Sequence, residues 1–190
     1  MDAKGIAAVT FALQSRLEAA LDLGDIAGGV HVGPLDDPSA GTAAAALFLY
    51  RVAVNAELRN AEHRLEPPSP GVAPIVHETS LPLDLHYLLT VGPGQSRDES
   101  TALRALGIAM QALNDAPQLS GLAVQGEAVR LSVDAVSGEE MSRIWNLFPT
   151  ANYRTSVIYL ATPVWIDPAS VALAAPPVTR EPHRVGPTFA

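Results

Sequence analysis

The chain has 190 residues, of which 48% are apolar and 17% are charged, and its 12 basic and 20 acidic side chains give a formal net charge of −8. This composition excludes a wholly disordered chain, which has too little apolar surface to offset the entropy lost on ordering. It also disfavours nucleic acid as a partner, because an acidic protein with scattered cations repels phosphate. The lack of cysteine excludes disulfides, thiolate metal sites and a cysteine nucleophile.

No segment has the pattern of a membrane span or a secretion signal. The longest apolar run, residues 43–50, stops at Arg51, whereas a span needs roughly 20 such residues. The N-terminal segment contains Asp2, Arg16 and Glu18, which a signal peptide would not place around its apolar stretch. We therefore expect a cytoplasmic protein that does not insert into a membrane.

The first third of the chain predicts a helix and two strands. Apolar residues at spacings of three and four predict a helix from about residue 6 to residue 21, ended by Gly24. A short strand is expected at 30–32, before a turn-rich stretch at 33–38. Residues 43–55 predict a strand that is covered on both sides of a sheet. Its apolar residues alternate, with Leu47 and Leu49 on one face and Phe48, Tyr50, Val52 and Val54 on the other.

The middle of the chain predicts a loop, a strand and a helix. Residues 66–74 contain four prolines and one glycine, which is typical of a loop or arm. A strand follows at 83–90, and the turn 92–94 ends it. Its predicted faces alternate, with one face formed by Leu83, Leu85, Tyr87 and Leu89 and the other by Asp84, His86, Leu88 and Thr90. The sequence from Ser96 to Glu99 matches a capping box, which predicts a helix that begins there and runs to about Asn114. The inward residues of this helix are expected to be Leu103, Leu106, Met110 and Leu113.

The last third predicts a strand, a helix and a second strand. Alternation over 129–135 predicts a half-buried strand with Val129, Leu131, Val133 and Ala135 inward. A second capping box, from Ser137 to Glu140, opens a helix that carries Met141, Ile144 and Trp145 and ends by Pro149. The final strand is expected at 155–164.

These elements predict one α/β (α+β) domain, with a central mixed β-sheet flanked by about three helices. We expect the domain to span residues 1–166. Residues 167–190 form a Pro/Ala-rich tail, expected to be extended and to gain order only from a neighbouring subunit or partner.

A search for catalytic and ligand-binding motifs gives little. The chain contains no glycine-rich phosphate loop, no dinucleotide fingerprint, no zinc-protease motif and no nucleophile elbow. The five histidines have no metal-ligand spacing, so a structural or solvent-facing role is favoured for each. Asp84 and His86 share a strand face, where an aspartate can orient an imidazole for base catalysis, but no nucleophile accompanies them. Trp145 and Trp165 are candidates for interface anchors, although core packing is the commoner role of a tryptophan on a helix. We predict no catalytic residue, cofactor or metal.

A set of segments carries a family resemblance over about residues 5–167. In order, they are LFLYRV (47–52), NAELRN (55–60), LPLDLHYLLT (81–90), LGIAMQAL (106–113), IWNL (144–147), YRTSVIY (153–159) and PVWID (163–167). Together they resemble the N-terminal domain of the tail-terminator or cap proteins of phage-tail-like contractile injection systems. The stretches 83–90 and 153–159 are the most specific.

The resemblance implies a structural protein of a bacterial particle. In that family six copies form a ring that ends the inner tube and the surrounding sheath, at the end away from the baseplate. The implied partners are further copies of the chain, the inner tube protein and the sheath protein. Some relatives are longer at the C-terminus, and the role of any additional domain there does not transfer.

The surfaces that contact these partners are expected to include six residues: Arg59, Asn60, Arg154, Tyr159, Trp165 and Asp167. Tyr159 and Trp165 are expected to anchor the tail where it leaves the body.

Two other interpretations remain open. A baseplate-end adaptor of the same particle would differ in its position on the intact particle. A small-molecule-binding or enzymatic α/β domain would require a convergent polar pocket, which Asp84 and His86 could begin to supply.

Overall fold

A computed structural model of the chain describes residues 1–65, 75–77, 79–92 and 98–169. Its elements in chain order are α1 (Gly5–Leu23), β1 (Val30–Val32), the 3-10 helix η1 (Pro38–Thr42), β2 (Ala45–Val54), β3 (His63–Leu65), β4 (Ile75–His77), β5 (Leu81–Val91), α2 (Glu99–Asp115), β6 (Gln118–Leu119), the 3-10 helix η2 (Leu122–Val124), β7 (Val129–Asp134), α3 (Gly138–Trp145) and β8 (Ser156–Ile166). Six strands form one sheet in the order β1-β2-β5-β8-β7-β6, and β3 and β4 pair separately. β1 is parallel to β2, and the other neighbouring strands of the sheet are antiparallel.

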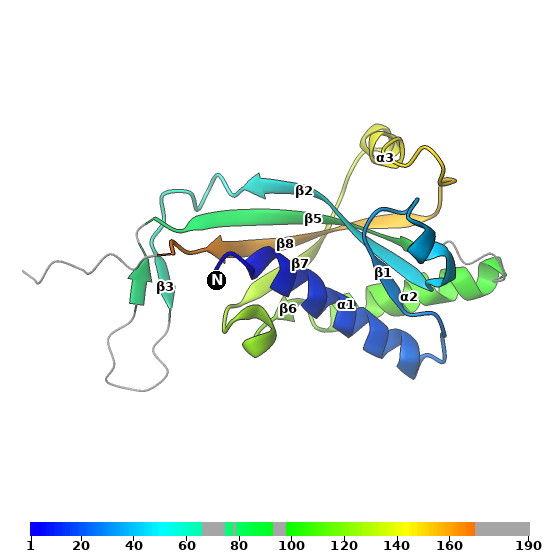
Figure 1. Cartoon of the computed structure of the whole chain (residues 1–190), viewed down its shortest axis with the longest axis horizontal. Helices are drawn as coiled ribbons and strands as arrows, with labels where there is room; N and C mark the ends of the chain where they lie inside the picture. The colour runs from blue at the N-terminus through cyan, green and yellow to red at the C-terminus, as the bar shows by residue number, and fades with distance from the viewer. Residues whose placement is uncertain (66–74, 78, 93–97, 170–190) are drawn as a thin grey trace, which may run out of the picture.

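The helices cover the two faces of the sheet unequally. Helices α1 and α2 lie on one face and α3 lies on the other (Figure 1). This arrangement confirms the predicted single α+β domain with a mixed central sheet and three helices. None of the helices in the described residues combines the length and hydropathy needed to cross a membrane.

The larger core lies between the sheet and the helices α1 and α2. Leu13 and Leu17 of α1 and Leu113 of α2 pack there against Leu85 and Leu89 of β5, and all five are almost fully buried. The predicted alternation of β5 is therefore confirmed, as is the end of α1 at Gly24. Burying one such leucine stabilises the fold by about 2 kcal/mol.

A smaller core lies on the opposite face, under α3. Trp145 and Phe148 cover Leu88 of β5 and Ile158 of β8. The ring of Phe48 meets that of Phe148 edge to face, with centroids 5.0 Å apart. Trp145 is thus a core residue in this fold.

Strand β2 contains a bulge that its sequence pattern did not predict. Leu49 lies opposite Tyr87 of β5, and the next paired residue, Arg51, lies opposite His86. Tyr50 is therefore an extra residue in β2. A single inserted residue reverses the face of every side chain that follows it.

The predicted faces of β2 are consequently wrong beyond Tyr50. Val52 lies opposite Leu85 and so is on the α1 and α2 face, not on the face of Phe48. Coverage of both faces holds for residues 45–47 only, because Val52 is 46% exposed and Val54 is 52% exposed. The second half of β2 extends beyond the helices that cover the first half (Figure 1).

The helix caps agree with the sequence in one case and differ in the other. Ser137 is the N-cap of α3, as predicted, and its hydroxyl accepts the Glu140 N–H at 3.1 Å. The N-cap of α2 is Asp98, which accepts the Thr101 N–H at 2.6 Å, so the prediction of a helix start at Ser96 is wrong. A carboxylate is an equally good cap acceptor and also complements the helix dipole, which favours the later start.

Three predicted segments lie outside the described residues, wholly or in part: the loop 66–74, the turn 92–94 beyond Gly92, and the tail beyond Ala169.

Three residues that were predicted to face inward are exposed: Leu103, Val133 and Ala135, the last of which lies just beyond the end of β7. Leu103 points outward from α2, whose buried stripe contains the small residues Ala105 and Ala109. Val133 of β7 is 59% exposed because it lies near the edge of the sheet. The two- and three-residue strands β3, β4 and β6 were not predicted, since segments of that length have no periodicity to detect, whereas the equally short β1 was expected at 30–32.

Candidate functional site

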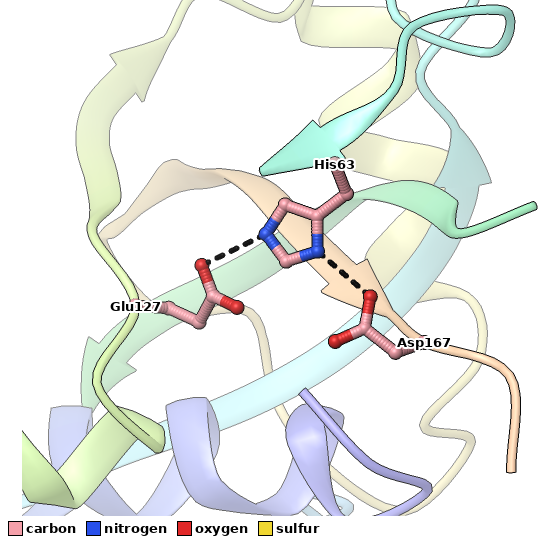
Figure 2. A group of neighbouring side chains, drawn as sticks. All are labelled: His63, Glu127 and Asp167. Carbon is pink, nitrogen blue, oxygen red and sulfur yellow. Dashed lines mark hydrogen bonds and ion pairs between the residues drawn. The ribbon is translucent and has the colours of Figure 1, made fainter. Parts of the chain in front are cut away.

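The described residues bring three ionisable side chains together from distant parts of the chain. His63 begins β3, Glu127 lies between η2 and β7, and Asp167 follows β8 (Figure 2). The β3–β4 hairpin places His63 beside the end of β8, although 104 residues separate it from Asp167.

The imidazole of His63 lies between the two carboxylates. Its Nδ1 is 2.7 Å from Oδ1 of Asp167, and its Nε2 is 3.2 Å from Oε2 of Glu127. The His63 side chain is buried, and its ring stacks on the indole of Trp165. Since both ring nitrogens face an acceptor, the arrangement suits an imidazolium, which donates from both.

The Met1 ammonium completes the charge balance. Its nitrogen lies 2.7 Å from Oδ2 of Asp167 and 3.3 Å from Oε1 of Glu127. Asp167 also accepts from the Ser80 hydroxyl, and its backbone N–H donates to the Met1 carbonyl at 2.7 Å. Two cations and two anions thus alternate in a partly buried network. We call His63, Glu127, Asp167 and the Met1 ammonium the His63 cluster.

The pKa values reflect this mutual compensation. Burial favours the neutral form of Asp167, but hydrogen bonds from the Met1 ammonium, Ser80 and His63 outweigh it and lower the pKa of Asp167 to about 2. Burial likewise opposes ionisation of Glu127, whose pKa is nevertheless lowered, chiefly by His63. For His63, burial opposes the charged form, yet the hydrogen bonds to Glu127 and Asp167 leave its pKa raised. All three groups are therefore driven toward their charged forms.

The same three side chains have the donor types that bind a divalent cation. One ligand atom from each lies within 4.8 Å of the others. In the present geometry, however, each imidazole nitrogen is engaged by a different carboxylate, so a cation could enter only by breaking one of these hydrogen bonds. As it stands, the cluster is a polar clamp that joins the N-terminus, β3, the segment before β7 and the end of β8.

Two of the predicted contact residues belong to this region. Asp167 is a member of the cluster, and Trp165 stacks on His63. The side chain of Tyr159 is buried in the larger core. The roles of these residues in contacts between chains stay predictions.

The other predicted contact residues lie elsewhere. Arg59 and Asn60 are exposed on the turn between β2 and β3. Arg154 lies before β8, and its Nη1 donates to the carbonyl of Gly92 at 2.7 Å. Arg154 thus lies at the opposite end of β8 from Trp165 and Asp167.

The strand-face neighbours Asp84 and His86 do not bond to each other. Nδ1 of His86 lies 3.0 Å from Oδ2 of Asp134 on β7. Asp84 accepts instead from Asn55, at 3.0 Å, and from the Thr162 hydroxyl. Each thus has its own partner on a neighbouring segment, which is the structural role that the sequence favoured.

Sequence reasoning missed His63 and Glu127 as members of a site. Neither residue lies in a motif, and nothing in the spacing of residues 63, 127 and 167 indicates that they meet. The short hairpin that positions His63 would have been the signal to seek, but its three-residue strands are too short to recognise.

These observations define an α+β scaffold in which the most buried ionic cluster of the described residues pairs its charges within the chain. The chain belongs to the family described as the Pvc16 N-terminal domain, whose model matches residues 8–180. No curated protein sequence matches it.

Two solved structures are similar to the chain. One is the sheath/tube terminator of an extracellular contractile injection system, PVC, in the extended state, with a TM-score of 0.65 and 21% identity over 97% of this chain and 64% of that one. The other is the tube-terminating cap of the anti-feeding prophage, AFP, with the same TM-score and identity over 93% of this chain and 60% of that one. The likeness at this identity shows the fold, and the chain spans less than two thirds of the length of either protein.

Proposed function

We propose that the chain is a structural terminator, which caps the inner tube and the sheath of a contractile phage-tail-like injection particle. The observation that carries the proposal is the family match over residues 8–180, together with a fold shared with two proteins that are themselves a sheath/tube terminator and a tube-terminating cap. The ionic cluster around His63 is consistent with a structural role, since its charged groups pair with one another.

The proposed active form is a ring of six copies. A cap must match the rotational symmetry of the tube that it ends, and a closed ring is the usual way to present identical contacts around an axis. Its partners are then the tube and sheath proteins, and its activity is assembly rather than catalysis. The exposed turn residues Arg59 and Asn60 support contacts of this kind, because their side chains lie on the surface, outside both hydrophobic cores.

Deletion of the gene tests the proposal. A terminator stops growth by occupying the addition surface of the last ring, so its loss should give tubes and sheaths of irregular length, or no mature particles. Electron microscopy of particles from the deletion strain measures this, with the restored gene as the control. Particles of normal length and normal contraction would overturn the proposal, and labelled protein at the baseplate end would indicate an adaptor instead.

A further inference from the structure

The strands β2 and β7, which lie next to the short edge strands β1 and β6, each have an open stretch. β1 pairs with β2 only along residues 45–47, and β6 pairs with β7 only along residues 129–130. Among the described residues, 49–54 of β2 and 132–134 of β7 therefore have no strand on their outer side. Open edges expose backbone donors and acceptors, which can pair with a strand of another chain.

In both stretches, backbone N–H groups of valine residues point to the open side of the strand. The Asn55 N–H donates inward, to Pro82 of β5, so alternation along the strand directs the N–H groups of Val52 and Val54 outward. In β7 the Leu131 N–H donates to Pro117, on the outer side, so the N–H of Val133 points outward as well.

The side chains of these valines lie on one face of the sheet. Val52 lies opposite Leu85, and Val133 lies opposite Tyr159, and both of these partners belong to the larger core on the α1 and α2 face. Each edge therefore presents half-exposed valine on the same face.

The opposite face carries charges of opposite sign. Arg51 is exposed on the β2 edge, and Asp134, with 34% of its side chain exposed, lies on the β7 edge. Pairing β2 with β7 brings Arg51 near Asp134, whereas pairing β2 with a second β2 brings arginine near arginine. Like charges on neighbouring strands are unfavourable, so a contact between unlike edges is favoured.

We propose that the open edge of β2 in one copy pairs with the open edge of β7 in the next copy, so that the sheet continues from subunit to subunit around a ring. This inference rests on the proposed function, which supplies the requirement for a ring. β2 and β7 run in opposite directions within one copy, so a neighbour in the same orientation presents them to each other as antiparallel strands. The contact joins two different surfaces, which is the type that closes into rings.

Cysteine cross-linking tests the contact without background, because the chain contains no cysteine. The double variants V52C/V133C and V54C/V133C place one thiol on each edge. Paired antiparallel residues lie within disulfide range, so mild oxidation should give a ladder of covalent oligomers that ends at the ring. The experiment is performed on the purified chain at high concentration and on isolated particles.

Three controls define the outcome. V52C alone and V133C alone should remain monomeric on a denaturing gel, and covalent dimers of either would show that like edges meet and would overturn the inference. V52C/L122C, with its second thiol at the 97% exposed Leu122 of η2, outside both open stretches, should give no ladder. The absence of a ladder from both double edge variants, in purified protein and in particles alike, would also overturn it.

Charged side chains introduced at the two edges give an independent test. V52K/V133K should raise the dissociation constant of the assembly by about tenfold or more, because it sets lysine against lysine across the contact. V52E/V133K should assemble more strongly than V52K/V133K, and equal weakening of the two would contradict the pairing. If oligomers form but the cross-links and the charged variants give no evidence of contact between these edges, the inference fails while the terminator proposal stands. If particles lacking the chain have normal length, the terminator proposal fails whatever the cross-links show.

Discussion

The imidazole of His63 lies parallel to the indole of Trp165, with ring centroids 4.7 Å apart and 11° between the planes. The edge of the same imidazole bonds Asp167, two residues beyond Trp165. The His63 side chain of β3 thus contacts the end of β8 in two ways, by ring stacking on Trp165 and by a hydrogen bond to Asp167. The contact fixes the position from which the remainder of the chain departs.

We predict that His63→Phe destabilises the chain. Phenylalanine retains a ring against Trp165 but removes both N–H donors, which leaves the Met1 ammonium as the one cation in the cluster for Glu127 and Asp167. The free energy of unfolding should fall by about 2 kcal/mol, as measured by urea denaturation. The matched control is Arg64→Ala on the same strand, which removes an exposed ion pair with Glu62 and should cost less than about 0.5 kcal/mol. A loss for His63→Phe no larger than that of the control would contradict the prediction.

Stability should also depend on pH through the cluster. The folded pKa of His63 is raised above 6.5, so its contribution is complete below pH 6.5 and is lost as the pH rises through the folded value. The folded pKa of Asp167 is lowered from 3.8 to about 2, so its contribution is complete above pH 3.8 and is lost as the pH falls toward 2. The clamp is therefore strongest between these two limits.

Comparison with His63→Gln isolates the loss of stability that follows deprotonation of His63 at higher pH, because glutamine does not titrate. The difference in unfolding free energy between the two proteins should be largest near pH 5 to 6 and should narrow as the pH rises above 6.5. Denaturant titrations at a series of pH values measure it. A difference that stays constant from pH 5 to pH 9 would mean that His63 is not protonated in the fold.

The outcome for β2 and β5 shows what the sequence could predict about the fold. The alternation of β5 is regular, and its faces were predicted correctly over its length. β2 has an equally clear pattern, yet its faces were misassigned after Tyr50, because a bulge depends on pairing with β5 and not on local propensity. The helices were found from periodicity, whereas the exposure of Leu103 depends on how α2 packs against its neighbours.

The His63 cluster was beyond the reach of the sequence for a related reason. Its members are joined by tertiary contacts over 64 to 166 residues, and only Asp167 was singled out in advance. Asp167 was assigned to the tail, but its carboxylate lies in the body of the domain. The boundary between domain and tail at residues 166 and 167 stays a prediction, with the side chain of Asp167 on the domain side.

A buried hydroxyl pair offers a test of the larger core. Thr10 of α1 and Tyr87 of β5 share a hydrogen bond of 2.8 Å, and burial raises the pKa of Tyr87 to about 12. The Thr10 hydroxyl also donates to the carbonyl of Ile6, so the Thr10 hydroxyl keeps a partner in Tyr87→Phe. Thr10→Val instead removes the hydrogen-bond partner of the Tyr87 hydroxyl, which is buried in the core. We expect a cost of about 1 kcal/mol for Tyr87→Phe and about 2 kcal/mol for Thr10→Val. Urea unfolding of both variants checks the order, and the reverse order would show that the Tyr87 hydroxyl finds another partner.

The final prediction separates Asp167 from the tail that follows it. Truncation after Ala169 leaves the whole His63 cluster intact and avoids placing a new terminal carboxylate beside it. Because the removed segment is rich in alanine and proline, we expect the melting temperature to change by about 1 °C or less. Asp167→Asn in the full chain removes the charge that pairs with His63 and the Met1 ammonium, and should lower the melting temperature by about 3 to 6 °C.

Assembly should respond in the opposite way to the same two changes. If the tail serves contacts with a neighbouring subunit or the particle, truncation after Ala169 should reduce incorporation into particles while the isolated domain stays stable, since arm contacts contribute to association and little to the core. Asp167→Asn should retain incorporation at temperatures well below its melting point. Both are measured by the amount of the chain that copurifies with particles, against its melting temperature in isolation. A large loss of melting temperature on truncation would assign the tail to the folded core, and full incorporation of the truncated chain would show that the tail is dispensable for assembly.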